Sequence, residues 1–347
     1  MKILVVGDSF VPVEVFRRGF ESLERSHHVE YVQLDESLAL KPVTKSERSI
    51  REYLGTPAQV ADRVAEVDVL AVHGAPVTAE VLDAGPRLKV VCCARGGPVN
   101  VDVKAASARR IPVVNTPGKN AEAVADQTIA FMVMLARGFP RAQRFLLDGG
   151  QLGESAYEGA RFLGHELGGH ALGLVGYGNV GRRVARRAIA FGMTVVAYDP
   201  FIQTDDLAGV RLVPSLASLL EVADFASLHV RASADTDNLF GRSEFAAMRP
   251  GSYFINTARE TLVDEAALDS ALASGRLAGA ALDVVRPHSA EGPHPLLRHA
   301  NVVITPHIGG ATHETLLRGV TMIAAEIENF AAGEPLGSVV NRLAVQV

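Results

Sequence analysis

Four of the chain's 11 histidines, His288, His294, His299 and His307, lie in one segment rich in proline and glycine. Crowded histidines suit a metal site, an acid–base relay or a solvated loop. Their spacing matches no helical or hairpin pair of metal ligands, and HELGGH at residues 165–170 is one residue too long for the zinc motif H-E-x-x-H. We therefore predict no metal site, which leaves acid–base chemistry or a surface role.

A glycine motif, Gly176-x-Gly178-x-x-Gly181, follows an apolar run and opens a helical segment. The first glycine permits a tight turn, the second lets backbone approach a pyrophosphate, and the third allows close helix packing. The next apolar run ends in Asp199, where a carboxylate would bind the adenosine ribose and repel a 2′-phosphate. The motif predicts a site for NAD rather than NADP. VVGDSF near the N-terminus lacks the spacing, so we expect no second dinucleotide there.

Short β-branched runs alternate with amphipathic segments along nearly the whole chain, and these elements must position the motifs. Continuous apolar strands separated by helices indicate parallel sheets that are covered on both faces. The sequence therefore predicts an α/β fold of two doubly wound lobes. We expect strands within residues 2–6, 29–34, 67–72, 89–93, 111–115, 171–176, 194–199, 225–230, 252–256, 277–284 and 301–306, and helices within 13–25, 56–67, 178–192 and 264–275.

The border between the lobes is predicted at the turn NTPG, after which a long apolar helix could bridge them. A second long helix, within residues 313–334, could return the chain to the first lobe. We therefore expect one lobe from residues 1–116 plus 312–347 and another from residues 117–311. The chain ends soon after the returning helix, so we expect no extra C-terminal regulatory domain. Residues 144–170 fit neither sheet, as is common for an oligomer contact.

The composition is that of a globular protein of two domains, with 347 residues of which 48% are hydrophobic. The formal charge of −5 gives no electrostatic reason to expect nucleic acid or an anionic membrane as partner. The adjacent Cys92 and Cys93 should lie on opposite faces of a strand as buried thiols, which suits a reducing compartment. No apolar run suits a signal peptide or a membrane span, so we expect a cytoplasmic protein.

Four motifs resemble, in order and spacing, those of the D-isomer-specific 2-hydroxyacid dehydrogenases: HELGGHALGLVGYGNVG, INTARETLVDEAAL, GRLAGAALDV and NVVITPHIGGAT. The nearest relatives would be enzymes of 3-phosphoglycerate, glycerate and hydroxypyruvate. The resemblance covers most of residues 90–315, whereas the first 90 residues match in pattern only. It implies a flavodoxin-like substrate lobe and a Rossmann NAD-binding lobe, a cleft between them, and a homodimer.

In that family an arginine, a histidine and a glutamate perform the chemistry. Arg259 in NTARE matches the arginine, which would bind the 2-oxo acid and stabilise charge on its carbonyl oxygen. His307 in TPHIGG matches the histidine, which would exchange a proton with that oxygen. Glu260 replaces a usual glycine, and His288 stands where the glutamate is expected. We hypothesise a His307–His288 pair with a more acidic working range than a Glu–His pair; Glu291 as the missing acid, or weakened catalysis, are the alternatives.

The resemblance also implies binding residues. The loop Arg95-Gly96-Gly97 would offer backbone N–H groups to a substrate carboxylate, with Arg95 facing a second anionic or polar group or only solvent. Asn120 would line the cleft. Asp283 would lie near the nicotinamide amide or serve only the structure of the strand end. The implied cofactor set is Gly176, Gly178, Asn179, Val180, Gly181, Asp199, Thr257, Ala258, Asp283 and Gly309.

The sequence therefore predicts an NAD-dependent oxidoreductase that transfers hydride between nicotinamide and a small D-2-hydroxy or 2-oxo acid, without nucleic-acid or membrane partners. The alternative is a dinucleotide-sensing interaction protein, because corepressors of the C-terminal-binding type resemble the family and the glutamate is missing here. Retained Arg259 and His307 speak against it. The polar segment KPVTKSERSIREYLG carries four basic residues that could contact a phosphorylated substrate or only face solvent: Lys41, Lys45, Arg48 and Arg51.

Overall fold

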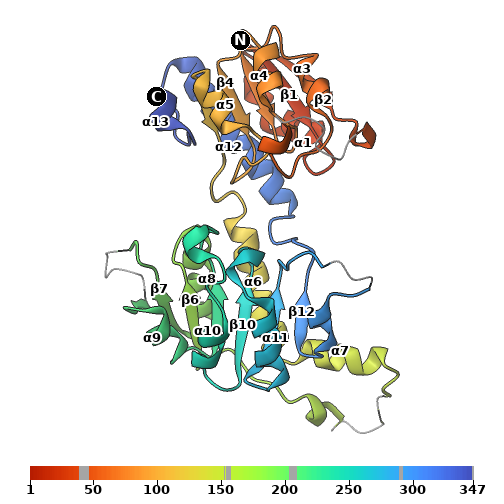
Figure 1. Cartoon of the computed structure of the whole chain (residues 1–347), viewed down its shortest axis with the longest axis vertical. Helices are drawn as coiled ribbons and strands as arrows, with labels where there is room; N and C mark the ends of the chain where they lie inside the picture. Colours follow the sequence, from red (N-terminus) through yellow and green to blue (C-terminus); the bar gives the residue numbers. More distant parts are fainter. Residues whose placement is uncertain (39–46, 152, 154–157, 203–208, 289–291, 346–347) are drawn as a thin grey trace. The chain divides into compact units, whose positions relative to one another are not determined.

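The computed structural model describes residues 1–38, 47–151, 153, 158–202, 209–288 and 292–345. The chain forms two compact units, one of Met1–Lys119 with Ala311–Val347 and the other of Asn120–Gly310, called unit 1 and unit 2 (Figure 1). Each unit holds one parallel sheet covered by helices, which confirms the predicted fold class. None of the helices within the described ranges has both the length and the apolar character of a membrane span.

Unit 1 is built on a five-stranded sheet of order β2-β1-β3-β4-β5. Its strands are β1 (Lys2–Gly7), β2 (His28–Gln33), β3 (Val69–Val72), β4 (Val90–Cys93) and β5 (Val113–Val114). Its helices are α1 (Val13–Gly19), α2 (Glu21–Glu24), α3 (Pro57–Ala61), α4 (Ala79–Ala84), α5 (Val103–Ala108), α12 (His313–Ala332) and α13 (Arg342–Val345), with short 3₁₀ helices at Glu36–Leu38 and Glu47–Ser49.

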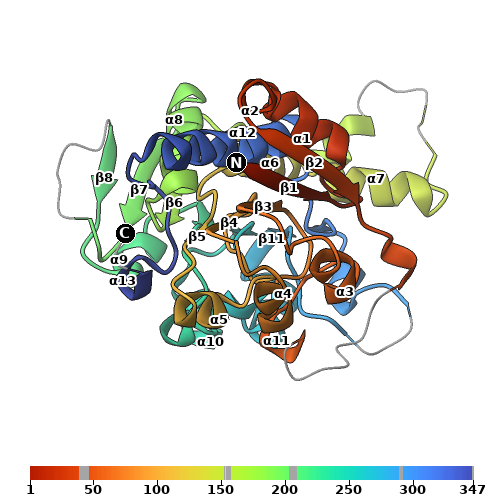
Figure 2. The ribbon, with the colours of Figure 1, turned by 90° about the horizontal axis from the view of Figure 1, so that it is seen from above.

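Strands β1, β3, β4 and β5 of unit 1 are buried on both faces because helices pack on each side, whereas the edge strand β2 is only partly buried. Ile3 and Val5 of β1 share a core with Phe16 of α1 and Ile323 of α12. Alternate residues of the same strands face a second core under α3, α4 and α5, and Figure 2 shows the two helix layers on opposite sides of the sheet. The same alternation puts Cys92 in one core and Cys93 in the other, both as unpaired thiols, as predicted.

Unit 2 is built on a seven-stranded sheet of order β12-β11-β10-β9-β6-β7-β8. Its strands are β6 (Ala171–Val175), β7 (Thr194–Tyr198), β8 (Val210–Leu212), β9 (Phe225–Leu228), β10 (Ser252–Asn256), β11 (Leu277–Leu282) and β12 (Val302–Ile304). Its helices are α6 (Ala121–Ala136), α7 (Phe139–Leu147), α8 (Asn179–Ala190), α9 (Leu216–Leu220), α10 (Arg242–Ala247) and α11 (Glu265–Ala273), with 3₁₀ helices at Glu158–Phe162, Ala234–Thr236, Glu260–Leu262 and Pro295–Arg298.

Several elements differ from the sequence-based prediction. The helix expected within residues 13–25 is divided at Phe20 into α1 and α2. The helix expected within residues 56–67 ends at Ala61, because the chain continues in turns in which Arg63 N–H donates to Val60 and Val67 N–H to Val64. The apolar spacing correctly predicted buried positions but not the extent of the helix. Strand β8 was missed because it has three residues and pairs only with β7 at the sheet edge.

Candidate functional site

The glycine motif connects β6 to α8 in a turn that only glycine fits at two of its three positions. Gly176 has φ of +98°, and a Cβ atom there would lie 2.8 Å from the His229 carbonyl oxygen. A Cβ atom on Gly181 would lie 2.3 Å from the Gly176 carbonyl oxygen. Neither contact is sterically allowed, so these glycines let the strand, the turn and the helix pack directly on one another.

Gly178 serves a different purpose, because a Cβ atom there would meet nothing within 4 Å. The next residue, Asn179, begins α8, and the helix has no side-chain cap at its N-terminus. Uncapped N–H groups and the helix dipole favour an anion at this end. The space at Gly178 and the first turn of α8, at Asn179 and Val180, therefore fit the pyrophosphate of a dinucleotide.

Asp199 follows β7 and is held against the glycine turn. Its carboxylate accepts hydrogen bonds from the Tyr177 N–H at 2.9 Å and from the Phe201 N–H at 3.0 Å. These two hydrogen bonds fix the position of the side chain, which is only partly buried and so remains accessible to a ligand. An anchored carboxylate here fits the ribose hydroxyls of NAD and disfavours the 2′-phosphate of NADP.

Arg259 follows β10 in a turn that Asn256 holds in place. The Asn256 side chain accepts from the Ala258 N–H at 2.9 Å and donates to the Arg259 carbonyl at 2.8 Å. The buried Thr257 hydroxyl lies 3.1 Å from that of Thr128 on α6. The guanidinium is exposed and donates to the Ala258 carbonyl at 2.6 Å, so it is placed where a carboxylate ligand could bind. Sequence analysis missed Asn256, whose strand-end position was the available signal.

His307 lies in the loop after β12 with a left-handed backbone, at φ of +56°. Its N–H donates to the Asp283 and Thr305 carbonyl oxygens, both at 2.9 Å. A left-handed conformation costs a residue with a Cβ atom about 1–2 kcal/mol, so surrounding contacts must hold it. The imidazole itself is exposed, which suits proton exchange with a ligand.

Asp283 follows β11 and anchors the loop after β12. Its carboxylate, 2% exposed, accepts hydrogen bonds from Gln127 Nε2 at 2.9 Å, Thr305 Oγ1 at 2.6 Å, the Ile308 N–H at 2.9 Å and the Gly309 N–H at 2.8 Å. A Cβ atom on Gly309 would lie 2.7 Å from this carboxylate. Sequence analysis proposed a nicotinamide contact for Asp283 and left open a structural function, and the contacts show that it organises the loop.

These residues gather at one edge of the unit 2 sheet. The glycine turn follows β6, Asp199 follows β7, Arg259 follows β10, and the anchored loop follows β12. Because every strand pair in this sheet is parallel, the carboxyl ends share one edge. Ligands of open α/β sheets bind at that edge.

His288 is not brought to His307. It is exposed, its Nε2 lies 3.2 Å from the Gly292 carbonyl oxygen, and its ring centroid lies 5.0 Å from that of His294. Within the ranges that the structure describes, it has no polar contact with His307. The alternative acid, Glu291, lies outside the described residues, as do Lys41 and Lys45.

The other two histidines of this segment pair with acidic residues of α11. His294 Nε2 lies 3.4 Å from a Glu265 carboxylate oxygen, and His299 Nε2 lies 2.8 Å from one of Asp269. Both histidine side chains are largely buried. These pairs tie the segment to the helix, which gives both histidines a structural function.

In unit 1 the loop after β4 is open at its two glycines. A Cβ atom on Gly97 would meet nothing within 4 Å, and one on Gly96 would meet only the Thr116 carbonyl oxygen at 3.8 Å. Among the described residues, neither glycine N–H has a hydrogen-bond acceptor. Two such N–H groups fit a carboxylate. Asn120 lies in unit 2, at the N-terminus of α6, and packs on Gly310.

Sequence analysis also missed His229, which follows β9. Its carbonyl oxygen faces the Cα of Gly176, and its Nε2 lies 3.0 Å from the Ser227 hydroxyl. Burial lowers the pKa of His229 to about 3, so the ring is neutral near pH 7. The signal available was its position at the end of a strand beside the glycine motif.

Comparison with known proteins gives a family match and close full-length relatives. Residues 129–309 match the model of the D-isomer specific 2-hydroxyacid dehydrogenase, NAD binding domain. A glyoxylate reductase of Korarchaeum cryptofilum is 36% identical over 342 residues, 97% of each chain. The crystal structure of the TT0316 protein from Thermus thermophilus superposes with a TM-score of 0.76 at 33% identity, covering 98% of this chain and 100% of that one.

Other relatives are longer than this chain. A D-3-phosphoglycerate dehydrogenase of Archaeoglobus fulgidus is 40% identical over 267 residues, which are 76% of this chain and 49% of that protein. The chain thus spans about half the length of the phosphoglycerate dehydrogenases that it matches. The similarity nevertheless includes the glycine turn and both loops that carry Arg259 and His307.

Proposed function

Because the chain belongs to the D-isomer-specific 2-hydroxyacid dehydrogenase family, we propose that it is an NAD-dependent oxidoreductase of a small D-2-hydroxy or 2-oxo acid. The observation that supports this most directly is the shared sheet edge in unit 2. There an open glycine turn with Asp199 accompanies an exposed arginine and an exposed, strained histidine. The buried thiols suit a reducing compartment, so we propose a cytoplasmic location.

Arg259 and His307 have distinct functions in this proposal. Bound NADH supplies the hydride for the substrate carbonyl carbon. The Arg259 guanidinium binds the acid and stabilises the negative charge that grows on the carbonyl oxygen. His307 donates the proton to that oxygen during reduction and takes it back during oxidation. In unit 1, the N–H groups of Gly96 and Gly97 bind the carboxylate.

The names of the relatives suggest the substrates to test, since they include glyoxylate, hydroxypyruvate and phosphoglycerate enzymes. We expect the purified chain to oxidise NADH with glyoxylate or hydroxypyruvate. Arg259→Lys should lower kcat/KM by roughly 10- to 100-fold, because an ammonium cannot form the two parallel hydrogen bonds of a guanidinium. NADH affinity, measured by fluorescence titration, should stay the same. Equal kcat/KM in both proteins would contradict the function given to Arg259.

A second function is favoured by one specific observation. Among the described residues, no carboxylate contacts the His307 imidazole, so the acid–base pair of the family is not assembled. A nucleotide sensor would keep NADH binding and the sheet-edge site without turnover. The same assay separates the two, since NADH binding with no turnover of any 2-oxo acid favours the sensor.

We propose a homodimer from the surface of α7. No residue of this helix is buried. Leu147 is 76% exposed, and Leu163 in the following segment is 82% exposed. Phe139 and Leu146 of the same helix are about half exposed, and contiguous apolar surface marks protein contacts where single exposed side chains do not. Sedimentation velocity should show a dimer for the chain and a monomer for Leu147→Asp. A monomeric wild type at micromolar concentration would overturn this proposal.

A further inference from the structure

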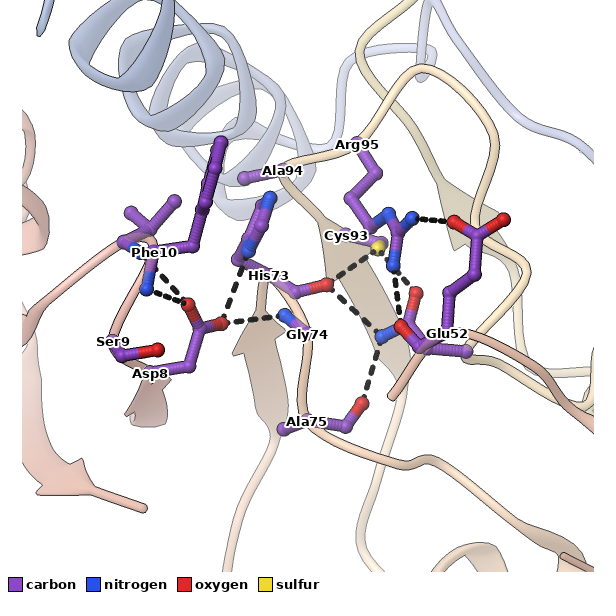
Figure 3. Close-up of polar contacts among 12 residues, drawn as sticks. Asp8, Ser9, Phe10, Glu52, His73, Gly74, Ala75, Cys93, Ala94 and Arg95 are labelled. Atoms are coloured by element: carbon purple, nitrogen blue, oxygen red, sulfur yellow. Dashed lines mark hydrogen bonds and ion pairs between the residues drawn. The ribbon is translucent and has the colours of Figure 1, made fainter. Parts of the chain in front are cut away.

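A second polar cluster lies in unit 1, where Asp8, His73 and Arg95 follow β1, β3 and β4 (Figure 3). Lys119, which follows β5, is the fourth member of the cluster. These strands are neighbours in the sheet and run parallel, so their carboxyl ends meet at one edge. That is the edge at which α/β sheets bind ligands. The four side chains therefore occupy a position suited to recognition.

Asp8 is fully engaged within the cluster. Its carboxylate accepts hydrogen bonds from the N–H groups of Phe10, Val11 and Gly74, at 2.9, 2.7 and 2.7 Å, and contacts His73 Nδ1 at 3.0 Å. Burial opposes its ionisation, but the His73 and N–H contacts outweigh it and lower the Asp8 pKa. The hydrogen bonds of Asp8 are thus all made to His73 and the loops, and its charge offsets that of Lys119 only in part, because burial still lowers the Lys119 pKa.

Lys119 is a buried ammonium that has no hydrogen bond to a carboxylate within the described ranges. It is 8% exposed, and among the described residues its ammonium has one hydrogen-bond acceptor, the Ala94 carbonyl at 2.6 Å. Burial, with a smaller contribution from the nearby Arg95, lowers the pKa of Lys119 to about 8, although the charge of Asp8 acts in the opposite direction. Leaving a charged ammonium buried without an anion is costly. An anionic ligand would remove this cost.

Arg95 has an anion, but one that is easily displaced. Figure 3 shows its guanidinium directed at Glu52, whose carboxylate and carbonyl oxygen it contacts. The Glu52 side chain is 66% exposed, and its backbone is left-handed at φ of +50°. The Arg95 side chain is only 19% exposed, so the glutamate is the solvated partner of this pair, and an anion that is better placed can compete with it for the guanidinium. Hydrogen bonds from Arg51 to Val99 and from Leu54 to Gly74 hold the Glu52 loop over this sheet edge.

We propose that Arg95 and Lys119 bind the second anionic group of a dianionic 2-oxo or 2-hydroxy acid, and that Glu52 occupies Arg95 until such a group displaces it. The inference rests on the proposed function, which supplies the reacting end of the substrate. A phosphomonoester and a carboxylate are both anionic, and both present oxygens that accept charge-assisted hydrogen bonds. Glu52 thereby becomes a specificity-determining residue, since its carboxylate competes with the substrate for one guanidinium.

Two matched substrate pairs test this proposal: phosphohydroxypyruvate against hydroxypyruvate, and 2-oxoglutarate against 2-oxopentanoate. Within each pair only the second anionic group differs, so the ratio of kcat/KM values isolates its recognition. Arg95→Gln should lower the ratio by about 10- to 100-fold, the effect of losing a charge-assisted hydrogen bond. Glu52→Gln should raise it by up to about fivefold. The substrate pair whose kcat/KM ratio changes shows whether the site recognises a phosphate or a carboxylate.

Glu66→Gln is the matched control, because the Glu66 side chain is as exposed as that of Glu52, 69% against 66%, and pairs with Arg87 at 3.0 Å, outside the cluster. It should leave both ratios unchanged. The inference would be overturned if the chain reduced hydroxypyruvate but neither Arg95→Gln nor Glu52→Gln changed the kcat/KM ratios. The proposed function would stand in that case.

Calorimetric titration of the full chain with inorganic phosphate is a readout independent of turnover. Glu52→Gln should tighten phosphate binding and Arg95→Gln should weaken it. If no 2-oxo acid is turned over, the proposed function fails, and these titrations still decide whether the anion site exists. Equal phosphate affinity in all three proteins would overturn the site.

Discussion

His307→Gln is expected to lower kcat/KM for a 2-oxo acid by roughly 10²- to 10⁴-fold, because the amide cannot donate the proton that reduction requires. The ring is exposed and its side chain supports no buried contact, so folding and NADH affinity should be unchanged. Stopped-flow rates and NADH fluorescence titrations measure the two effects separately. His28→Gln, at an exposed histidine of β2, is the matched control and should keep full activity. Turnover within tenfold of wild type in His307→Gln would contradict the proposed acid–base function.

The same rates measured against pH test the predicted His288–His307 pair. If His288 reaches His307 during turnover, the carboxylate of His288→Glu should stabilise the His307 imidazolium. The acid that donates the proton would then remain protonated to higher pH, and the alkaline limb of the reduction rate would move upward. The observed contacts of His288, with Gly292 and His294, predict no such movement. Identical profiles for wild type and His288→Glu would therefore exclude the pair.

The fold could be predicted from the sequence because its strongest signals are local. Continuous apolar strands such as residues 2–6 are buried on both faces of a parallel sheet, and they alternate with amphipathic helices. Prediction failed where the local pattern was ambiguous. Val60, Val64 and Val67 have helical spacing and are all buried, yet tight turns replace the helix after Ala61. The apolar spacing therefore predicts which residues are buried, but it does not determine the backbone conformation that buries them.

The site divides in the same way. The glycine turn could be predicted because Gly176 and Gly181 are required by local sterics, within a few residues of one another. The Asp8–His73 contact joins residues 65 apart, and it exists because β1 and β3 are neighbours in register, with Val6 opposite Val72. No property of either residue indicates that pairing. Polar networks across strand ends therefore follow from strand order, which the sequence alone did not supply.

Asp283 shows how such a network can control chemistry. Its carbonyl oxygen holds the His307 N–H, and its carboxylate holds the Ile308 and Gly309 N–H groups. Three consecutive backbone positions of the strained loop thus depend on one residue. A left-handed histidine would relax to an ordinary conformation if these contacts were lost, because that relaxation recovers about 1–2 kcal/mol. The imidazole would then leave its position without any change in its own identity.

Asp283→Ala should therefore affect stability and rate together. Four donors lose a buried charged acceptor, and a loss of about 3 kcal/mol would lower the melting temperature of a unit of this size by roughly 6–12 °C. Displacement of the His307 loop should lower kcat by roughly 10²-fold even far below the melting transition. Calorimetry and rates at low temperature measure the two effects.

Thr305→Val is the matched control for the anchor. It removes one donor, the hydroxyl at 2.6 Å from the carboxylate, and preserves the side-chain shape. It should therefore cost about 1 kcal/mol and leave most of the activity, since the backbone donors still hold the loop. If Asp283→Ala melted at a lower temperature but kept the wild-type kcat, the aspartate would stabilise unit 2 without positioning His307. A fall in kcat with the melting temperature unchanged would instead mean that Asp283 acts on the ligand directly, as the sequence resemblance implied.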